Sequence, residues 1–382
     1  MGFHEFSSPY DWSRIAAYKR TAKAAFGGMI DLSVGSPVDP VPDSVRKALA
    51  AAANDPNAYG YPATAGTADL RAAIAEWFSA TRNVDLQAIH ADVVPTVGSK
   101  EGVALMASLL HFGEDDVVVQ PKVSYPTYEI GTQLAGAQVL KVDDVADVAS
   151  WRNVPGVKAV WVNSPCNPTG EVYSAERMAG IVAAAREIGA VVLSDECYAL
   201  MQWRGATNSA DDDPLQSTPC ALRSDVCAGS AEGVLVLYSL SKQSNMAGYR
   251  TAFIAGDESL IASMSAYRKQ IGQIIPGPVQ AAMAAGLRDL ESVKVQHARY
   301  RERLGVLVSA LRAYGYCTDM PDGALYVWVR AKSGDCWTDM EQLAKIGIIA
   351  SPGEFYGAPE CLRFSATASD EAIASAAERL AR

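Results

Sequence analysis

Apolar residues recur along the chain in two periods, one typical of buried strands and one typical of amphipathic helices. Continuous apolar runs of strand length end near residues 120, 162, 195 and 239, and turn residues bound them. Outside these runs, segments such as 67–80 and 175–188 place apolar residues at helical spacing. Strands that alternate with helices are typical of a parallel sheet. The pattern therefore predicts an α/β fold, in which a mostly parallel sheet is flanked by helices.

The length of the chain predicts more than one domain. A chain of 382 residues is too long for one ordinary core, so two domains are expected. The C-terminal part again alternates short strands with helices, which indicates a smaller second α/β domain. We assign residues 1–40 to an N-terminal arm and part of the small domain, 41–280 to the large domain, and 281–382 to the small C-terminal domain.

Local signals predict the character of several segments. Asp43 or Ser44 is expected to cap the helix that follows, because both side chains can accept a hydrogen bond from free backbone N–H groups. Residues 292–314 have helical period and are expected to form a solvated helix between the domains. The polar stretch 205–233, with the acidic run Asp211–Asp213, is interpreted as a surface insertion.

Composition and charge narrow the range of partners. The formal net charge of −10 argues against nucleic acid, because phosphate backbones need a basic surface. No apolar run is long enough to span a bilayer, and the first residues lack the basic start and apolar block of a secretory signal, so a cytoplasmic protein is expected. The seven cysteines and four histidines show no CxxC pair and no metal-ligand spacing, which predicts free thiols and no metal site.

The strongest chemical signal is Lys242, in the segment YSLSKQSNMAGYR that directly follows a buried apolar run. The end of such a strand is where open α/β sheets hold their ligands. The amine of a lysine in a partly apolar pocket can condense with an aldehyde as a Schiff base. Eight residues later, Arg250 offers a planar guanidinium that suits a phosphate, and Ser239 and Ser241 add hydroxyl donors. An amine beside a phosphate clamp predicts a site for a phosphorylated aldehyde, and pyridoxal 5′-phosphate (PLP) is the candidate cofactor.

Other segments supply groups that this cofactor needs. Gly98, Ser99 and Lys100 join a strand to a helix, and the free amides of a helix N-terminus bind anions. Asp195 lies at the C-terminal end of another predicted strand. A carboxylate there can keep the ring nitrogen of PLP protonated, so that the ring withdraws electrons from the reacting carbon. Arg363 stands inside a short apolar run, an unusual place for a charge unless a ligand binds it.

The chain resembles the PLP-dependent aminotransferases of fold type I, class I/II. The resemblance covers nearly the whole chain and rests on the lysine segment, on the Asn-Pro-Thr-Gly turn at 167–170, and on the pattern Tyr-x-x-x-x-Gly-x-x-x-Leu-Arg from Tyr61 to Arg71. It implies transfer of an amino group between an amino acid and a keto acid, with Lys242 as the base. It also implies a homodimer with shared active sites, because the family tyrosine at the place of Tyr61 reaches the cofactor phosphate of the partner subunit.

The resemblance also implies roles for individual residues. Tyr125 is expected against the face of the PLP ring, and Asn167 and Tyr198 are expected to bind its phenolic oxygen. The catalytic residues implied are Lys242, Asp195 and Tyr198, and the substrate-binding residues are Gly35, Asn167 and Arg363, of which Arg363 binds the α-carboxylate. The full set of expected cofactor-binding residues is Tyr61, Gly98, Ser99, Lys100, Tyr125, Asn167, Asp195, Tyr198, Ser239, Ser241, Lys242 and Arg250.

A narrower likeness concerns the substrate. The stretches VGSPVDPVP, GSKE, YRKQIGQIIPGPVQAAM and PGEFYG resemble the actinobacterial-type N-succinyldiaminopimelate aminotransferases of lysine biosynthesis. This likeness implies N-succinyl-LL-diaminopimelate as the amino donor and α-ketoglutarate as the acceptor. Arg268 and Lys269 are candidate cations for the far end of such a donor.

Several alternatives stay open. Aminotransferases for aspartate, alanine or aromatic amino acids, and a PLP-dependent carbon–sulfur lyase of the same fold, would use the same cofactor residues. A non-catalytic, ligand-sensing regulator would need a basic DNA-binding domain. The acidic chain and the early start of the aminotransferase-like pattern argue against that reading.

Overall fold

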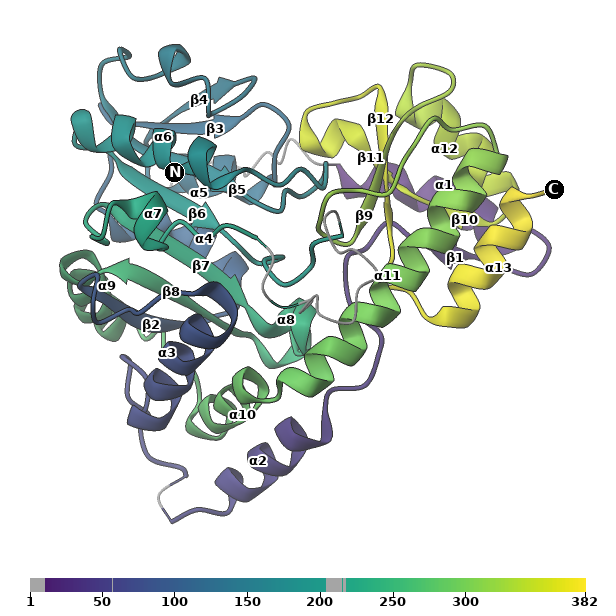
Figure 1. Ribbon diagram of the computed structural model, residues 1–382. Helices are drawn as coiled ribbons and strands as arrows, with labels where there is room; N and C mark the ends of the chain where they lie inside the picture. The colour runs from purple at the N-terminus through teal and green to yellow at the C-terminus, as the bar shows by residue number, and fades with distance from the viewer. Residues whose placement is uncertain (1–10, 57, 204–214, 216–217) are drawn as a thin grey trace, which may run out of the picture. The chain divides into compact units, whose positions relative to one another are not determined.

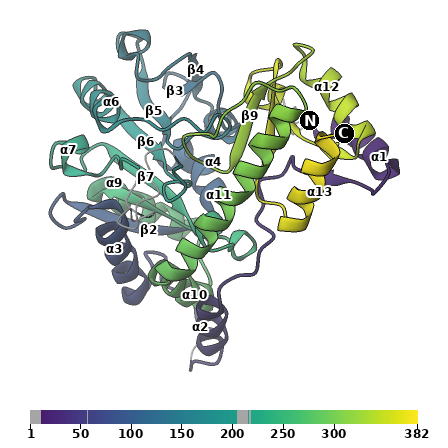
Figure 2. The ribbon, with the colours of Figure 1, turned by 45° about the vertical axis from the view of Figure 1, so that its right-hand side comes forward.

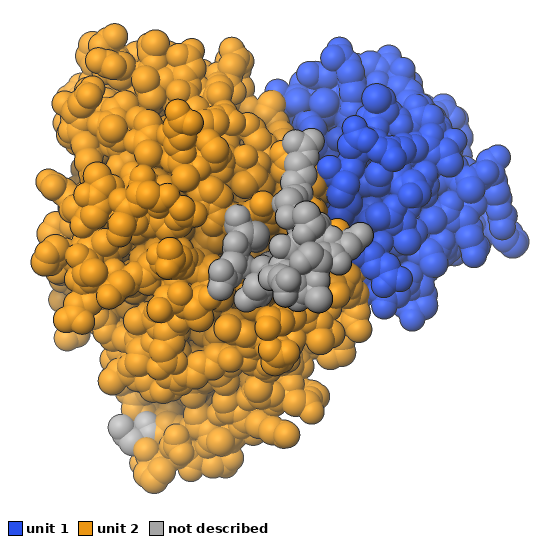
Figure 3. Space-filling view, viewed as in Figure 1, with its two compact units in different colours: residues 1–35, 302–320, 325–382 blue, residues 36–301, 321–324 orange. Residues whose placement is uncertain are grey.

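The structure, a computed structural model of the 382-residue chain, describes residues 11–56, 58–203, 215 and 218–382. It divides into two compact units (Figure 3). Unit 1 contains the chain up to Gly35 together with Glu302–Met320 and Leu325–Arg382, and unit 2 contains Ser36–Arg301 and Pro321–Ala324. Among the described residues, no helix combines the length and the apolar character needed to cross a membrane. In the same part of the chain, no cluster of His, Cys, Asp and Glu is placed to hold a metal ion.

Unit 2 is organised around a seven-stranded sheet with the strand order β2-β8-β7-β6-β5-β3-β4 (Figure 1). The strands are β2 (Ala91–Val97), β3 (Val117–Pro121), β4 (Gln138–Val142), β5 (Val157–Asn163), β6 (Val191–Asp195), β7 (Val234–Ser239) and β8 (Thr251–Asp257). Neighbouring strands from β7 to β4 are parallel, whereas β8 runs antiparallel to both β2 and β7. The predicted α/β fold with a mostly parallel sheet is therefore confirmed.

Helices cover both faces of this sheet because its strands are apolar on both sides. Along β7, Val234 and Val236 belong to one buried cluster, whereas Leu235 and Leu237 belong to the other. The second cluster is completed by α4 (Ser99–Leu109), α5 (Thr127–Leu134) and α9 (Glu258–Gln270). The first is completed by α2 (Asp43–Ala53), α3 (Ala68–Arg82), α6 (Ala175–Glu187), α7 (Ser224–Cys227) and α10 (Gly277–Arg288). Two shorter elements of unit 2, η1 (Val148–Ser150) and η2 (Ala247–Tyr249), are 3-10 helices.

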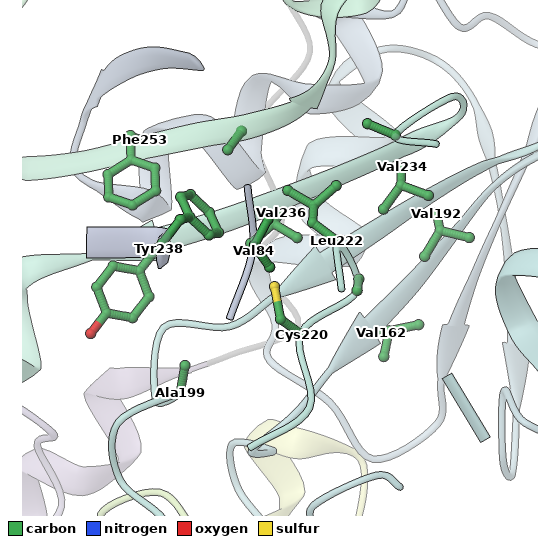
Figure 4. Close-up of a cluster of buried hydrophobic side chains, with 14 of the residues drawn as sticks. Val84, Val162, Val192, Ala199, Cys220, Leu222, Val234, Val236, Tyr238 and Phe253 are labelled. Carbon is green, nitrogen blue, oxygen red and sulfur yellow. The ribbon is translucent and has the colours of Figure 1, made fainter. Parts of the chain in front are cut away.

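The segment interpreted as a surface insertion is only partly described. Its acidic run Asp211–Asp213 lies outside the described residues. From residue 218 onward the interpretation is wrong, because Cys220 and Leu222 are fully buried beside Val192 and Val236 of the sheet (Figure 4). The sequence does not indicate this burial clearly, because the apolar run is short and follows a polar stretch.

Two local predictions about helices are corrected. Neither Asp43 nor Ser44 caps α2, whose N-cap is Pro42; the hydroxyl of Ser44 instead donates to Asp289. The helix predicted at 292–314 is α11 (Leu290–Ala313), which contributes to both units and is the long helix in Figure 2. It is not solvated all round, because Tyr300, Leu304 and other side chains of one face are fully buried.

Unit 1 combines segments from both ends of the chain. A three-stranded antiparallel sheet has the order β11-β12-β9, and β1 pairs with β10 in parallel. The strands are β1 (Ile30–Asp31), β9 (Tyr326–Arg330), β10 (Ile348–Ile349), β11 (Ser351–Pro352) and β12 (Cys361–Ser365). The other elements are α1 (Trp12–Ala24), α12 (Cys336–Lys345), η3 (Gly353–Tyr356) and α13 (Asp370–Leu380).

Candidate active site

The carboxyl ends of the parallel strands bring several predicted residues to one edge of the sheet in unit 2. Asn163, Asp195 and Ser239 are the last residues of β5, β6 and β7, and Asn163 lies opposite Asp195 in the ladder. Gly98 directly follows β2, and Tyr125 follows β3 by four residues. Because β2, β3, β5, β6 and β7 all run in the same direction, these residues lie where α/β sheets hold ligands.

Asp195 is a buried carboxylate with two hydrogen-bond donors. The hydroxyl of Tyr128 donates to Oδ2 over 2.7 Å, and the backbone N–H of Cys197 donates to Oδ1 over 3.1 Å. Burial raises the pKa of Asp195, and the two hydrogen bonds act in the opposite direction. Burial and the neighbouring carboxylate raise the pKa of Tyr128 well above its usual value, so Tyr128 remains the protonated donor. Such a carboxylate is suited to pair with a protonated ring nitrogen.

Sequence reasoning missed Tyr128. Its ring stacks on Trp161 with centroids 4.5 Å apart and an angle of 18°, and Tyr125 meets its ring at 5.7 Å. A usable signal was present, because Tyr128 lies one helical turn after Tyr125 and a buried tyrosine hydroxyl needs a partner. The partner, Asp195, is 67 residues away in the sequence.

The predicted turn at 167–170 is anchored to the sheet by Asn163, a second residue that sequence reasoning missed. The side-chain amide of Asn163 donates to the backbone oxygen of Asp195 over 2.9 Å, and its Oδ1 accepts from the N–H of Asn167 over 2.8 Å. Gly170 has a φ of 78°, and a Cβ there would lie 2.8 Å from Cβ of Pro321. The turn therefore holds buried Asn167 at a fixed place beside the end of β6.

Lys242 lies in α8 (Leu240–Gln243), a single turn that directly follows β7, and its side chain is half-buried. Ser239 fixes the start of this turn. Its hydroxyl accepts from the N–H of Ser241 over 3.1 Å and donates to the backbone oxygen of Thr251 over 3.1 Å. Ser239 thus ties the lysine turn to β8.

The pKa of a buried thiol, that of Cys197, is shifted by residues from three strand ends. Burial and the Asp195 carboxylate raise the pKa of Cys197, while a hydrogen bond with Ser99 and the charge of Lys242 act in the opposite direction. Asp195, Ser99 and Lys242 thus all act on one side chain. Tyr198, the next residue, is also buried.

Gly98 and Arg250 form a close contact that suits an anion. The guanidinium of Arg250 donates to the backbone oxygens of Ala247 over 2.7 Å and of Val97 over 3.5 Å. A Cβ on Gly98 would collide with this guanidinium, which would then have to move, and Gly98 has a φ of 78°, so the backbone favours glycine here. Arg250 itself has a φ of 56°, a strained conformation of the kind found at functional sites.

The helix α4 completes this contact. It begins at Ser99, and no side chain caps its N-terminus. Backbone N–H groups at an uncapped helix start are donors for a phosphate, and the helix dipole favours the negative charge. We call Gly98, Ser99, Arg250 and the start of α4 the phosphate cradle.

Two predicted residues are exposed. Lys100, in the first turn of α4, faces solvent. Tyr61 is fully exposed, and Tyr59 beside it is 92% exposed. An aromatic side chain that contributes nothing to the core of its own chain is consistent with a contact to a second chain.

Arg363 and Gly35 lie in unit 1. Arg363 is in the middle of β12, is 5% exposed, and donates to the backbone oxygen of Ser33 over 2.8 Å. Its guanidinium lies over the rings of Tyr326, at 4.0 Å, and Tyr356, at 4.8 Å. Gly35 is required where it stands, because a Cβ would collide with the hydroxyl of Tyr326. The predicted buried charge in a strand is therefore present, and aromatic rings that sequence reasoning missed hold it.

Arg268 does not fit its predicted role. Its side chain is fully buried and forms an ion pair with Glu101, Nη1 to Oε1, over 2.7 Å. A guanidinium with a resident carboxylate is not available for the far end of a substrate. Lys269, the other candidate, is exposed.

The buried carboxylate, the half-buried lysine and the phosphate cradle lie at the carboxyl edge of one mostly parallel sheet and fit PLP. A fold and a site of this kind define a PLP-dependent enzyme of fold type I. The description "Aminotransferase class I and II" belongs to the family model that matches residues 27–380. The chain belongs to this family, its cofactor is PLP, and it is a transaminase.

Individual relatives agree with the family. The chain is 40% identical over 373 residues to the 4-dedimethylamino-4-oxo-anhydrotetracycline transaminase of Streptomyces rimosus, covering 97% of this chain and 98% of the relative. It is 40% identical over 377 residues to a probable aminotransferase of Mycobacterium tuberculosis, covering 97% and 84%. Among solved structures, a probable N-succinyldiaminopimelate aminotransferase from Thermus thermophilus is similar with a TM-score of 0.84 and 27% identity, covering 97% and 99%.

Proposed function

We propose that this transaminase moves an amino group from N-succinyl-LL-diaminopimelate to α-ketoglutarate, forming glutamate. The sequence stretches that resemble N-succinyldiaminopimelate aminotransferases support this substrate, as does the similar Thermus thermophilus structure. Relatives at 28–29% identity that carry the name LL-diaminopimelate aminotransferase support a donor of this chemical class.

The residues of unit 2 are proposed to hold the cofactor in three groups. The first binds the phosphate, the second binds the ring and its phenolic oxygen, and the third tethers the cofactor. The residues proposed to bind the phosphate are Gly98, Ser99, Lys100, Ser239, Ser241 and Arg250, together with Tyr61 of the partner subunit. The residues proposed to bind the ring and its phenolic oxygen are Tyr125, Asn167, Asp195 and Tyr198. Lys242 is proposed to tether the cofactor.

The chemistry follows from where these side chains lie. Bound PLP supplies an aldehyde that condenses with amines and a pyridinium ring that withdraws electrons from them. Asp195, held by Tyr128, keeps the ring nitrogen protonated. Lys242 would tether the cofactor through Nζ, and the same amine would accept the proton from the α-carbon of the substrate. The half-buried position of Lys242 limits the access of water to this proton.

Arg363 and Gly35 are proposed to bind the substrate α-carboxylate. A guanidinium can bind a carboxylate through two parallel hydrogen bonds, which orients the α-carbon. The two tyrosine rings leave Arg363 few rotamers, so its orientation is set before the substrate arrives. We also propose that residues 41–280 act as the cofactor-binding domain and that the N- and C-terminal ranges, 1–40 and 281–382, form the small domain.

The working form is proposed to be a cytoplasmic homodimer. Unit 2 exposes Tyr59, Tyr61, Tyr267 and Ile271, apolar side chains of the kind that association would bury. All seven cysteines are free thiols, which suits a reducing compartment. Sedimentation of the PLP-loaded protein is expected to give a dimer, and a fully active monomer would contradict the role of Tyr61.

A panel of amino donors tests the substrate. With α-ketoglutarate as the acceptor, kcat/KM is expected to be highest for N-succinyl-LL-diaminopimelate. The panel contains LL-diaminopimelate, aspartate, alanine, an aromatic amino acid and cystathionine, with glutamate formation as the readout. A clearly higher kcat/KM for aspartate would overturn the proposed donor. Pyruvate and ammonia formed from cystathionine without any keto acid would instead indicate a carbon–sulfur lyase.

A second candidate is amination of a ketone on a large ring system. The 40% identity over 97% of this chain to a transaminase named for such a substrate favours it. Run in the direction of amination, with glutamate as the donor, the same assay can use a polycyclic ketone. A higher kcat/KM for that ketone than for the keto acid product of N-succinyl-LL-diaminopimelate would favour the second candidate.

A further inference from the structure

A buried ion pair lies directly behind the phosphate cradle. The guanidinium of Arg268, on α9, makes two parallel contacts with the carboxylate of Glu101, on α4: 2.7 Å from Nη1 to Oε1 and 3.2 Å from Nη2 to Oε2. The side chain of Arg268 is 0% exposed and that of Glu101 is 16% exposed. Two-point contacts of this kind fix the relative orientation of both groups.

The same pair is joined to the cradle by hydrogen bonds. Oε2 of Glu101 accepts from the backbone N–H of Val97 over 3.1 Å, and Nη2 of Arg268 donates to the backbone oxygen of Pro95 over 3.4 Å. The carbonyl of Val97 in turn accepts from Arg250 over 3.5 Å. Val97, the last residue of β2, therefore contacts Glu101 through its N–H and Arg250 through its C=O. Arg268 thus holds the end of β2 through Pro95 and Glu101, and Gly98 directly follows this strand end.

The negative charge of Glu101 gives a second reason why Arg268 is needed beside it. Glu101 lies in the first turn of α4, two residues after Ser99. A carboxylate at this place, without a counter-charge, would oppose the binding of a phosphate at the same helix start. Arg268 supplies the counter-charge from the buried side, without occupying the cradle.

We propose that Arg268 and Glu101 position the phosphate cradle, so that Arg268 sets the affinity for phosphate-bearing ligands without touching them. The proposal rests on the assignment of Gly98 and Arg250 to the cofactor phosphate. Arg268 is a positioning residue. Its guanidinium contacts Glu101 on α4 and the backbone oxygens of Pro95 on β2 and of Gln273, which follows α9, and none of these contacts involves Asp195 or Lys242, so its effect is expected to be specific for the phosphate.

The test compares ligands with and without a phosphate. Full-length R268M is freed of cofactor, and its affinities for PLP, pyridoxal and inorganic phosphate are measured, the first two by absorbance and the third by competition with PLP. The affinities for PLP and inorganic phosphate are expected to fall about tenfold or more, as for the loss of a charge-assisted contact. The affinity for pyridoxal is expected to stay within about twofold. An equal fall for PLP and pyridoxal, or no fall for either, would overturn the proposal.

A matched control is R186M. Arg186 also lies in unit 2, and its guanidinium donates to the backbone oxygens of Cys227, Ser230 and Glu232. None of these hydrogen bonds reaches β2 or α4. R186M is expected to keep the preference for PLP over pyridoxal. If R186M loses this preference to the same extent as R268M, the effect is general loosening of unit 2 and the proposal is wrong.

Two further variants keep the test decisive. R268K, which retains the charge and loses the two-point contact, replaces R268M if R268M does not fold; it is expected to lose part of the phosphate preference, and an unchanged preference contradicts the proposal. R250M tests the cradle itself. If R250M keeps the phosphate preference, the assigned cradle is wrong; if R250M loses it and R268M keeps it, only the role of Arg268 fails.

Discussion

Two arginines are proposed to bind anions, and the structure holds them in opposite ways. Arg250, in unit 2, is exposed, has a left-handed backbone conformation, and rests against Gly98 with its guanidinium on two backbone oxygens. Arg363, in unit 1, is buried in the middle of β12, with its guanidinium over the rings of Tyr326 and Tyr356.

This difference in how the two arginines are held matches the two kinds of ligand that they are proposed to bind. The cofactor phosphate stays in place through many turnovers, and Arg250, which is proposed to bind it, is held by two backbone oxygens. The substrate carboxylate leaves in every turnover, and Arg363, which is proposed to bind it, lies over two aromatic side chains. Substitutions at the first arginine should therefore act on cofactor affinity, and substitutions at the second on the KM of amino acids.

The largest effect is expected at Lys242, because the two arginines are proposed to bind ligands, whereas the lysine is proposed to take part in the reaction. Lys242→Ala is expected to lower kcat by about 10³-fold or more, because it removes both the tether and the proton acceptor. The visible absorbance band of the tethered cofactor should disappear with it. Spectra and glutamate formation measure both, and turnover that persists with the band intact would contradict the role of Lys242.

The second effect is at Arg363. Arg363→Lys keeps the charge but loses the planar fork, so kcat/KM for amino donors is expected to fall about 10- to 100-fold, mostly through KM. The affinity for PLP should not change. Steady-state kinetics with a PLP titration separates the two, and a loss of PLP affinity equal to the loss in kcat/KM would remove the distinction between the arginines.

The third effect is at the cradle. Gly98→Ala introduces a Cβ that collides with Arg250 at a left-handed φ, so the guanidinium must move. PLP affinity is expected to fall about tenfold, as for the loss of a charge-assisted hydrogen bond. At saturating PLP, the KM for the amino donor should be close to that of the unchanged enzyme. An effect on KM alone would place Gly98 on the substrate side.

The smallest effect is expected at Tyr128, whose hydrogen-bond partner is Asp195 and neither of the two arginines. Its hydrogen bond stabilises the ionised form of Asp195, so Tyr128→Phe raises the pKa of Asp195 further. Asp195 is then protonated at a higher pH than before, and the activity that needs the carboxylate is lost at a higher pH on acidification. At neutral pH kcat should fall only severalfold to about tenfold, as for one hydrogen bond to a charged group. A pH profile of kcat with an unmoved acidic limb would show that Tyr128 does not support Asp195.

Local pattern was enough to predict the strands of unit 2 and the residues at their ends. Apolar runs mark the strands. Asp195 is the last residue of one of these strands, and Lys242 lies in the turn that follows another. The partners of these residues depend on the assembled fold. Arg268 meets Glu101 across 167 residues, so neither side chain carries a local signal for the other. The cap predicted for α2 failed for the same reason, because Ser44 donates to Asp289, which is 245 residues away in the sequence and directly follows α10.

The alternation of side chains along β7 limits how this enzyme can be redesigned. Deleting one residue between Val234 and Tyr238 would exchange the sets of side chains that face the two helical layers. The same deletion would shorten the strand that leads into α8 and draw Lys242 back along the sheet by about 3.3 Å. Libraries that vary loop length to change substrate range should therefore leave the strands intact and place insertions after the strand ends.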